Sequence, residues 1–181
     1  MHWAGKSTAA QSLLPSFLGT NEFVNADEIA RGISPFNPEA VSFLAGRLML
    51  ERLQSLMGRG ASFAFETTLS TRYYLRLIKE ARSGGYSVRM IFLWLPNVRL
   101  ARERVKQRVL EGGHNIPDNI IQRRYDRGLK NFFSSFIQVL DTWVFIDNSK
   151  GAFELIAENT GKSVQIHKSD LWESLKNEYT N

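Results

Sequence analysis

Short apolar segments alternate with amphipathic segments along most of this chain. The apolar segments are 22–25, 62–65, 88–95 and 143–147. The amphipathic segments between them are 37–58, 70–83, 98–110 and a long stretch that begins at Pro117. Strands that alternate with helices in this way predict an α/β fold, with a doubly wound, mainly parallel sheet flanked by helices. The nearly continuous apolar sequence of 88–95 is typical of a strand that is covered on both faces.

The C-terminal part of the chain gives a less regular pattern. We expect a helix from about Ala152, a small strand at 164–167 and a polar tail. Residues 9–18 predict a further short helix, with Pro15 near its end.

The sequence Gly5-Lys6-Ser7-Thr8 is the second half of a phosphate-binding loop, whose full pattern is Gly, four residues of any type, Gly, Lys, and Ser or Thr. In such a loop the backbone N–H groups of residues 5–8 point at phosphate oxygens of ATP. Lys6 would neutralise the β- and γ-phosphates, and the hydroxyl of Ser7 would ligate Mg²⁺. The alternative is a chance tetrapeptide at a frayed end.

The first glycine of this pattern would fall one position before Met1, together with the strand that feeds the loop. We therefore expect a P-loop NTPase-type sheet that lacks its first strand. Such a chain would arise from a start site placed too late or from a decayed gene.

Composition limits the class of protein. A chain of 181 residues with 43% hydrophobic content predicts a single domain, 1–181, with a sizeable core. The sequence shows no transmembrane run and no signal peptide, and the absence of cysteine excludes disulfides, in agreement with a cytoplasmic protein. The net charge of +5 indicates an anionic partner, either a nucleic acid or the phosphates of a small ligand.

Two carboxylates follow apolar segments, and the ends of parallel strands share one edge of a sheet, where ligands bind. Asp27 is either the N-cap of the helix that follows or a base that accepts a proton from an attacking hydroxyl. Glu66 is either a turn residue or a carboxylate that holds a substrate hydroxyl or a Mg²⁺-bound water.

Arginines are concentrated in two successive helical segments. They are Arg99, Arg102, Arg104 and Arg108 in the first segment, and Arg123, Arg124 and Arg127 in the second. Most of them can be explained as a solvated helix surface. The functional alternative is a lid-like segment at about 99–127 that closes over ATP, with Arg108 and Arg124 stabilising charge on the transferred phosphoryl group.

Three stretches together resemble the zeta-toxin family of P-loop kinases. They are FVNADEIA at 23–30, FAFETT at 63–68, and the segment that runs from Gly112-Gly113-His114 to Arg123-Arg124-Tyr125. The resemblance spans roughly residues 4–149. It implies an α/β kinase fold, the use of ATP with Mg²⁺, and an antitoxin protein as a partner. Characterised members phosphorylate a hydroxyl of UDP-N-acetylglucosamine and so starve cell-wall synthesis.

Carried over by motif, the resemblance makes Asp27 the base and assigns Lys6 and Ser7 to the phosphates and Mg²⁺. It places Glu66 and Thr68 in the substrate pocket and Arg108 and Arg124 in the lid. The leading prediction is therefore a kinase that acts on a small hydroxyl-bearing acceptor, for example a nucleotide sugar. The alternatives are a nucleotide-binding remnant without catalysis and, ranked last, a nucleic-acid-binding protein that uses the arginine helices.

Overall fold

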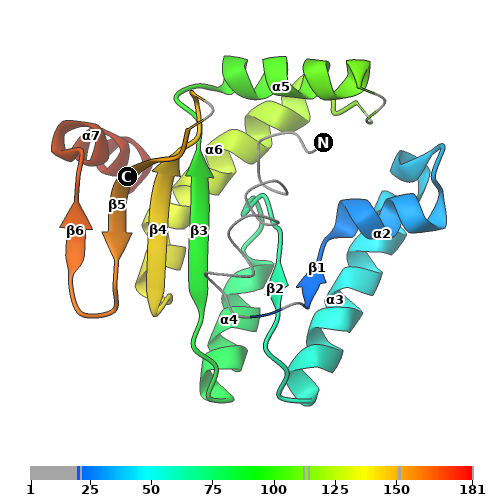
Figure 1. Cartoon of the computed structure of the whole chain (residues 1–181), viewed down its shortest axis with the longest axis horizontal. Helices are drawn as coiled ribbons and strands as arrows, with labels where there is room; N and C mark the ends of the chain where they lie inside the picture. Colours follow the sequence, from blue (N-terminus) through cyan, green and yellow to red (C-terminus); the bar gives the residue numbers. More distant parts are fainter. Residues whose placement is uncertain (1–19, 21, 112, 114, 151, 181) are drawn as a thin grey trace. The chain divides into compact units, whose positions relative to one another are not determined.

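The computed structural model describes residues 20, 22–111, 113, 115–150 and 152–180. The predicted phosphate loop, Gly5 to Thr8, and the predicted helix at 9–18 lie outside the described residues. Helices and strands alternate along the described chain, which confirms the α/β class (Figure 1). No helix in the described part is long and apolar enough to cross a membrane.

The chain divides into two compact units. The first comprises residues up to Thr67 together with Val105–Asn115, and the second comprises Thr68–Arg104 and Ile116–Asn181. The helix α5 (Val98–Leu110) contributes its first half to the second unit and its second half to the first unit.

The first unit contains a pair of short parallel strands and two helices. Its elements are β1 (Phe23–Val24), α2 (Ala26–Ile33), the 3-10 turn η1 (Pro38–Val41), α3 (Ser42–Gly58) and β2 (Ala64–Phe65). Helix α3 buries Ala45, Met49, Leu53 and Leu56, which recur at helical spacing on one face. The sequence pattern predicts Ala45, Leu53 and Leu56 in this stripe, but Met49 is buried where the pattern predicts Leu48, which is only half-buried.

The second unit is built on a mixed sheet with the strand order β3-β4-β5-β6. These strands are β3 (Arg89–Trp94), β4 (Thr142–Asp147), β5 (Glu154–Asn159) and β6 (Val164–Ile166). Strands β3 and β4 are parallel, whereas β5 is antiparallel to both β4 and β6. The last two connections are only a few residues long, and short connections can join only antiparallel strands. The predicted mainly parallel sheet is thus a mixed one.

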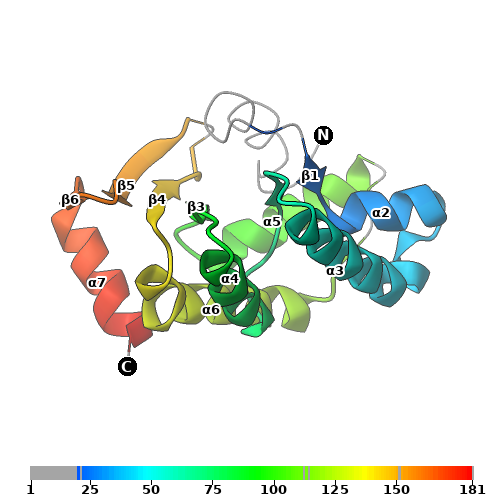
Figure 2. The ribbon, with the colours of Figure 1, turned by 90° about the horizontal axis from the view of Figure 1, so that it is seen from below.

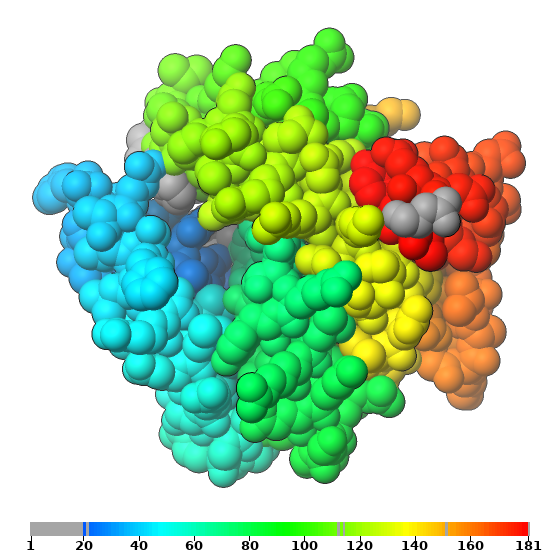
Figure 3. Space-filling view, turned by 180° about the vertical axis from the view of Figure 1, so that it is seen from behind, coloured from blue at the N-terminus to red at the C-terminus, as the bar shows by residue number. Residues whose placement is uncertain are grey.

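Three helices cover one face of this sheet. Figure 2 shows α4 (Tyr73–Ser83), α6 (Asp118–Ser134) and α7 (Ser169–Thr180) on the same side of the strands, and Figure 3 shows the surface that they form. The core between sheet and helices is strongly aromatic, and its fully buried members include Phe132, Phe136 and Phe145. The 3-10 turn η2 (Phe136–Gln138) follows α6.

The predicted order of helix, strand and polar tail in the C-terminal part of the chain is wrong. Residues 154–159 form the strand β5 rather than a helix, and the expected polar tail is the helix α7. Glu, Leu and Ala in this stretch favour a helix locally, but Ile156 and Ala157 are fully buried in the sheet, where β5 pairs with β4 and β6. Tertiary pairing overrides local propensity here.

Two local predictions are also corrected. The sequence Asn37-Pro38-Glu39 predicts a helix start with Asn37 as the cap, but the side chain of Asn37 makes no capping hydrogen bond, and the 3-10 turn η1 precedes α3. Strand β3 is only partly buried apart from Trp94, and within the described residues it is an end strand of its sheet. Its apolar run therefore does not mark a fully buried strand.

The loop after β2 is held tightly against α6. Leu69 has a positive φ of 57°, which is unfavourable for a branched side chain, and its carbonyl accepts a hydrogen bond of 2.8 Å from the buried amide of Asn131. Gly128 lies opposite, where an added Cβ would stand 2.8 Å from the carbonyl oxygen of Thr68. The helix needs glycine at this position because the loop backbone approaches so closely.

Replacing Gly128 with alanine should destabilise the protein by about 1–3 kcal/mol, since the clash is with backbone and not with a flexible side chain. Gly46 provides the matched control. It also lies inside a helix, and a Cβ there would meet nothing within 4 Å. Gly46→Ala should therefore stabilise by up to about 1 kcal/mol. Chemical denaturation of both variants checks the two signs, and equal effects would contradict the close approach.

Candidate functional site

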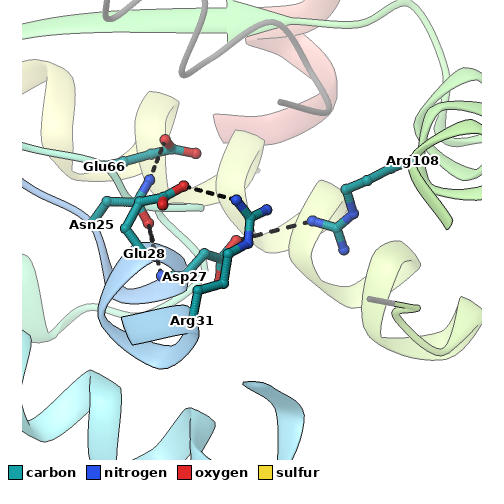
Figure 4. A network of polar contacts seen from close by, with 6 residues as sticks. All are labelled: Asn25, Asp27, Glu28, Arg31, Glu66 and Arg108. Atoms are coloured by element: carbon teal, nitrogen blue, oxygen red, sulfur yellow. Dashed lines mark hydrogen bonds and ion pairs between the residues drawn. The ribbon is translucent and has the colours of Figure 1, made fainter. Parts of the chain in front are cut away.

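The register of β1 and β2 brings Asn25 and Glu66 together. Val24 pairs with Phe65, so the next residue on each strand lies beside the other at the carboxyl end of the pair. The side-chain Nδ2 of Asn25 donates a hydrogen bond of 3.0 Å to Oε2 of Glu66 (Figure 4). Asn25 is 8% exposed, so this contact is largely shielded from water.

Asn25 is also the N-cap of α2. Its side-chain carbonyl accepts hydrogen bonds from the backbone N–H groups of Asp27 at 2.8 Å and Glu28 at 3.4 Å. The alternative in which Asp27 caps the helix is therefore wrong. Asp27 lies in the first turn, where a negative charge interacts favourably with the helix dipole, and its carboxylate stays available for another role.

The Asp27 carboxylate faces a buried cation. Its Oδ2 lies 4.0 Å from Nη1 of Arg108, whose side chain is only 3% exposed, whereas the Asp27 side chain is 48% exposed. One end of the ion pair is thus enclosed by protein while the other can meet a ligand from solvent. Asp27, Glu66 and Arg108 all belong to the first unit.

Gly113 makes room for the Arg108 side chain. A Cβ on Gly113 would stand 2.4 Å from Cγ of Arg108, and the N–H of Gly113 donates a hydrogen bond of 2.8 Å to the Arg108 carbonyl. Any side chain at this position would push the arginine away. The glycine in the predicted lid-like segment therefore shapes the place where Arg108 lies.

The remaining predicted site residues belong to the second unit or lie outside the described residues. Arg124 lies half-buried on α6, and the hydroxyl of Thr68 is 3.0 Å from that of Ser70. Gly5, Lys6, Ser7 and Thr8 are outside the described residues.

The other arginines of α5 have separate environments. Arg99 is exposed and lies 3.7 Å from Glu103, whereas Arg102 donates to Gln122 at 3.0 Å. Arg104 donates to the backbone carbonyl of Asn148. Burial lowers the pKa of Arg104 from its ordinary value, and the nearby Asp147 carboxylate opposes this shift. The arginines of this helix therefore do not form one continuous solvated surface.

The described residues contain no cluster of three or more acidic or histidine side chains that could hold a metal ion. Mg²⁺ in nucleotide sites takes one or two protein ligands together with water and phosphate oxygens, so the site's donors are compatible with it. The exposed carboxylate of Asp27 beside the enclosed Arg108 guanidinium suits a hydroxyl group that reacts next to a phosphate.

Sequence reasoning missed Asn25 and Gly113 as site residues. An asparagine that ends a strand and precedes two acidic residues is a recognisable N-cap signal, and it could have identified Asn25. The requirement for glycine at position 113 comes from its contact with Arg108, which the sequence does not reveal.

The sequence of this chain is similar to that of known proteins. Residues 4–161 match the family model described as Zeta toxin. A protein of Haemophilus influenzae, itself uncharacterized, is 29% identical over 125 residues, which are 68% of this chain and 89% of that protein.

Solved structures share the fold. A chain in the AvrRxo1-ORF1:AvrRxo1-ORF2 crystal structure with ATP superposes with a TM-score of 0.73 at 18% identity, covering 96% of this chain. The toxin–antitoxin system PezAT of Streptococcus pneumoniae gives 0.64 at 12% identity, covering 95% of this chain and 73% of that one. This chain spans only 60% of the matching AvrRxo1 chain.

The fold is an α/β fold of the kind found in solved toxin structures such as PezAT. The chain belongs to the zeta toxin family, whose model covers most of its length. This family consists of ATP-dependent kinases, as the sequence motifs predict.

Proposed function

We propose that this protein is an ATP-dependent phosphotransferase that moves the γ-phosphate to a hydroxyl of a small acceptor, in the class of nucleotide sugars such as UDP-N-acetylglucosamine. The observation that carries the proposal is the exposed Asp27 carboxylate 4.0 Å from the enclosed Arg108 guanidinium, in a chain of the zeta toxin family. A base beside a fixed cation is what transfer of a phosphoryl group to a hydroxyl requires.

In this proposal Asp27 accepts the proton of the acceptor hydroxyl as that oxygen attacks the γ-phosphorus. The bond from the γ-phosphorus to the β–γ bridging oxygen breaks, and ADP leaves with the electron pair. Arg108 and Arg124 stabilise the negative charge on the phosphoryl oxygens, where fixed cations lower the barrier most. Glu66 and Thr68 hold the acceptor. Bound Mg²⁺ would neutralise phosphate charge.

The residues Gly5, Lys6, Ser7 and Thr8 form the proposed phosphate loop of a P-loop NTPase-type fold. Their backbone N–H groups would bind the phosphates of ATP, with Lys6 as a point charge and Ser7 as the Mg²⁺ ligand. The proposal also includes a cytoplasmic location and an antitoxin partner. The partner is supported by the AvrRxo1-ORF1:-ORF2 complex and by PezAT, both of which are similar in fold.

Calorimetric titration with ATP and Mg²⁺ tests the nucleotide part of the proposal. We expect saturable binding to the unaltered chain and at least about tenfold weaker binding to Lys6→Ala, because the loop lysine interacts directly with the phosphates. The control is Lys176→Ala on α7, where the lysine is exposed. Equal binding by Lys6→Ala and the unaltered chain would contradict the assignment.

The same preparation separates the two alternatives. A remnant without catalysis would bind ATP and transfer nothing. A nucleic-acid-binding protein would bind duplex DNA with an affinity that falls steeply with salt and does not depend on Lys6.

A further inference from the structure

The two carboxylates of the candidate site are connected by a single amide side chain. Asn25 uses its carbonyl for the backbone of Asp27 and Glu28, and its NH₂ group for the carboxylate of Glu66 (Figure 4). The first contact fixes the start of α2, which carries Asp27, and the second fixes a side chain that follows β2. One residue thus touches both elements.

The chemistry of these contacts requires an amide at this position. Aspartate or serine could also cap the helix, because each has an oxygen that accepts N–H hydrogen bonds. Neither could donate to Glu66 in the same geometry, since a carboxylate has no donor at neutral pH and a serine side chain is shorter. Only a side chain that accepts at one end and donates at the other fits both neighbours.

The burial of Asn25 makes its hydrogen bonds difficult to replace. Asn25 is 8% exposed, so water can replace a lost partner only poorly. The amide is also held from both sides, by the β1–β2 register and by the first turn of α2. Rotation about the side chain would break contacts to both elements at once.

We propose that Asn25 is a positioning residue that fixes Asp27 and Glu66 relative to each other for phosphoryl transfer. The inference rests on the proposed function, and it adds a residue to which no role has been given. Asn25 would act through the two carboxylates and not through contact with the reacting atoms.

The test exchanges donor and acceptor across the Asn25–Glu66 hydrogen bond. Asn25→Asp keeps the cap but places a second carboxylate against Glu66, and Glu66→Gln removes the charge on the other side. The double variant Asn25→Asp/Glu66→Gln restores one donor and one acceptor with their roles reversed. We expect Asn25→Asp to lower the unfolding midpoint by roughly 3 °C or more, and the double variant to recover most of that loss.

Activity provides the readout that a purely structural residue would not change. Asn25→Ser keeps an oxygen for the cap and adds no charge, but it cannot reach Glu66. We expect its kcat for transfer from ATP to UDP-N-acetylglucosamine to fall at least about tenfold, with the KM for ATP changed less than about twofold. Asn37→Ser is the matched control, because Asn37 occupies an N-cap position without making a capping hydrogen bond.

The outcomes are distinct. Additive effects of Asn25→Asp and Glu66→Gln on the unfolding midpoint would overturn the coupling. An unchanged kcat in Asn25→Ser would overturn the role of Asn25 in positioning the carboxylates for transfer. If the unaltered protein transfers no phosphate to the acceptor, the proposed function fails, while the unfolding cycle still decides whether Asn25 couples the two elements.

Discussion

Asp27→Asn is expected to slow phosphoryl transfer by about 10²–10⁴-fold while the affinity for ATP and Mg²⁺ stays within about twofold. Asparagine has nearly the shape of aspartate, but its amide cannot accept the proton of the acceptor hydroxyl. The substitution also removes the charge 4.0 Å from Arg108, so the unfolding midpoint must be recorded beside the rate. Steady-state kinetics, calorimetric titration and thermal unfolding of one preparation provide the rate, the affinity and the unfolding midpoint.

The control for this prediction is Asp170→Asn. Asp170 lies in the first turn of α7, as Asp27 lies in the first turn of α2, so both substitutions remove the same favourable interaction with a helix dipole. Asp170 is exposed, and its substitution should leave transfer unchanged. Transfer by Asp27→Asn at more than half the unaltered rate would contradict the assignment of Asp27 as the base.

Phe145→Ala is expected to cost about 3–5 kcal/mol of stability, the largest effect of any single substitution considered. Phe145 has no exposed surface, and its ring stacks on Phe92 with centroids 5.0 Å apart. It also contacts Phe132 at 5.2 Å and Trp172 at 5.5 Å, so one ring joins the sheet to α6 and α7. Removing it leaves a cavity that a strand held by neighbours on both sides cannot close.

Urea unfolding followed by tryptophan fluorescence measures this loss. Phe36→Ala is the control, because Phe36 is fully exposed and its removal should change stability by no more than about 0.5 kcal/mol. A loss below about 1 kcal/mol in Phe145→Ala would mean that the aromatic cluster is not the core of the second unit.

The sequence predicts the helices better than the sheet. The helix α5 begins and ends where its pattern predicts, and α3 ends at Gly58 as predicted, although it begins at Ser42, after the 3-10 turn η1. Periodicity of this kind is local and depends on few neighbours. Strand β5 could not be predicted in the same way, because its helix-favouring residues become a strand through pairing with β4 and β6.

The sequence identifies the charged residues of the candidate site but not how they are held. Asp27, Glu66 and Arg108 were chosen from strand ends and a basic helix, and the structure places them in one unit. The roles of Asn25 and Gly113 in the site were not predicted, since the first acts through hydrogen bonds between distant segments and the second through an absent side chain. Such roles depend on contacts between segments that are distant in the sequence, and a sequence motif does not show these contacts.

The half-buried Tyr125 shows another effect of packing that the sequence does not reveal. Burial raises the pKa of Tyr125 to about 12, and Glu178 and Asp126 add to this shift. Its hydroxyl therefore stays protonated at neutral pH and continues to donate the 2.9 Å hydrogen bond to the carbonyl of Leu95, at the end of β3. This bond holds α6 to the sheet.

The most direct test of the central claim is transfer of label from ATP that carries it on the γ-phosphate, followed by separation of the nucleotide sugars by chromatography. With Mg²⁺ and UDP-N-acetylglucosamine present, the account predicts label on the sugar nucleotide with the unaltered chain and at most a trace with Asp27→Asn. If the unaltered chain binds ATP but no nucleotide sugar becomes labelled, the claim that it is a phosphotransferase for this class of acceptor is contradicted.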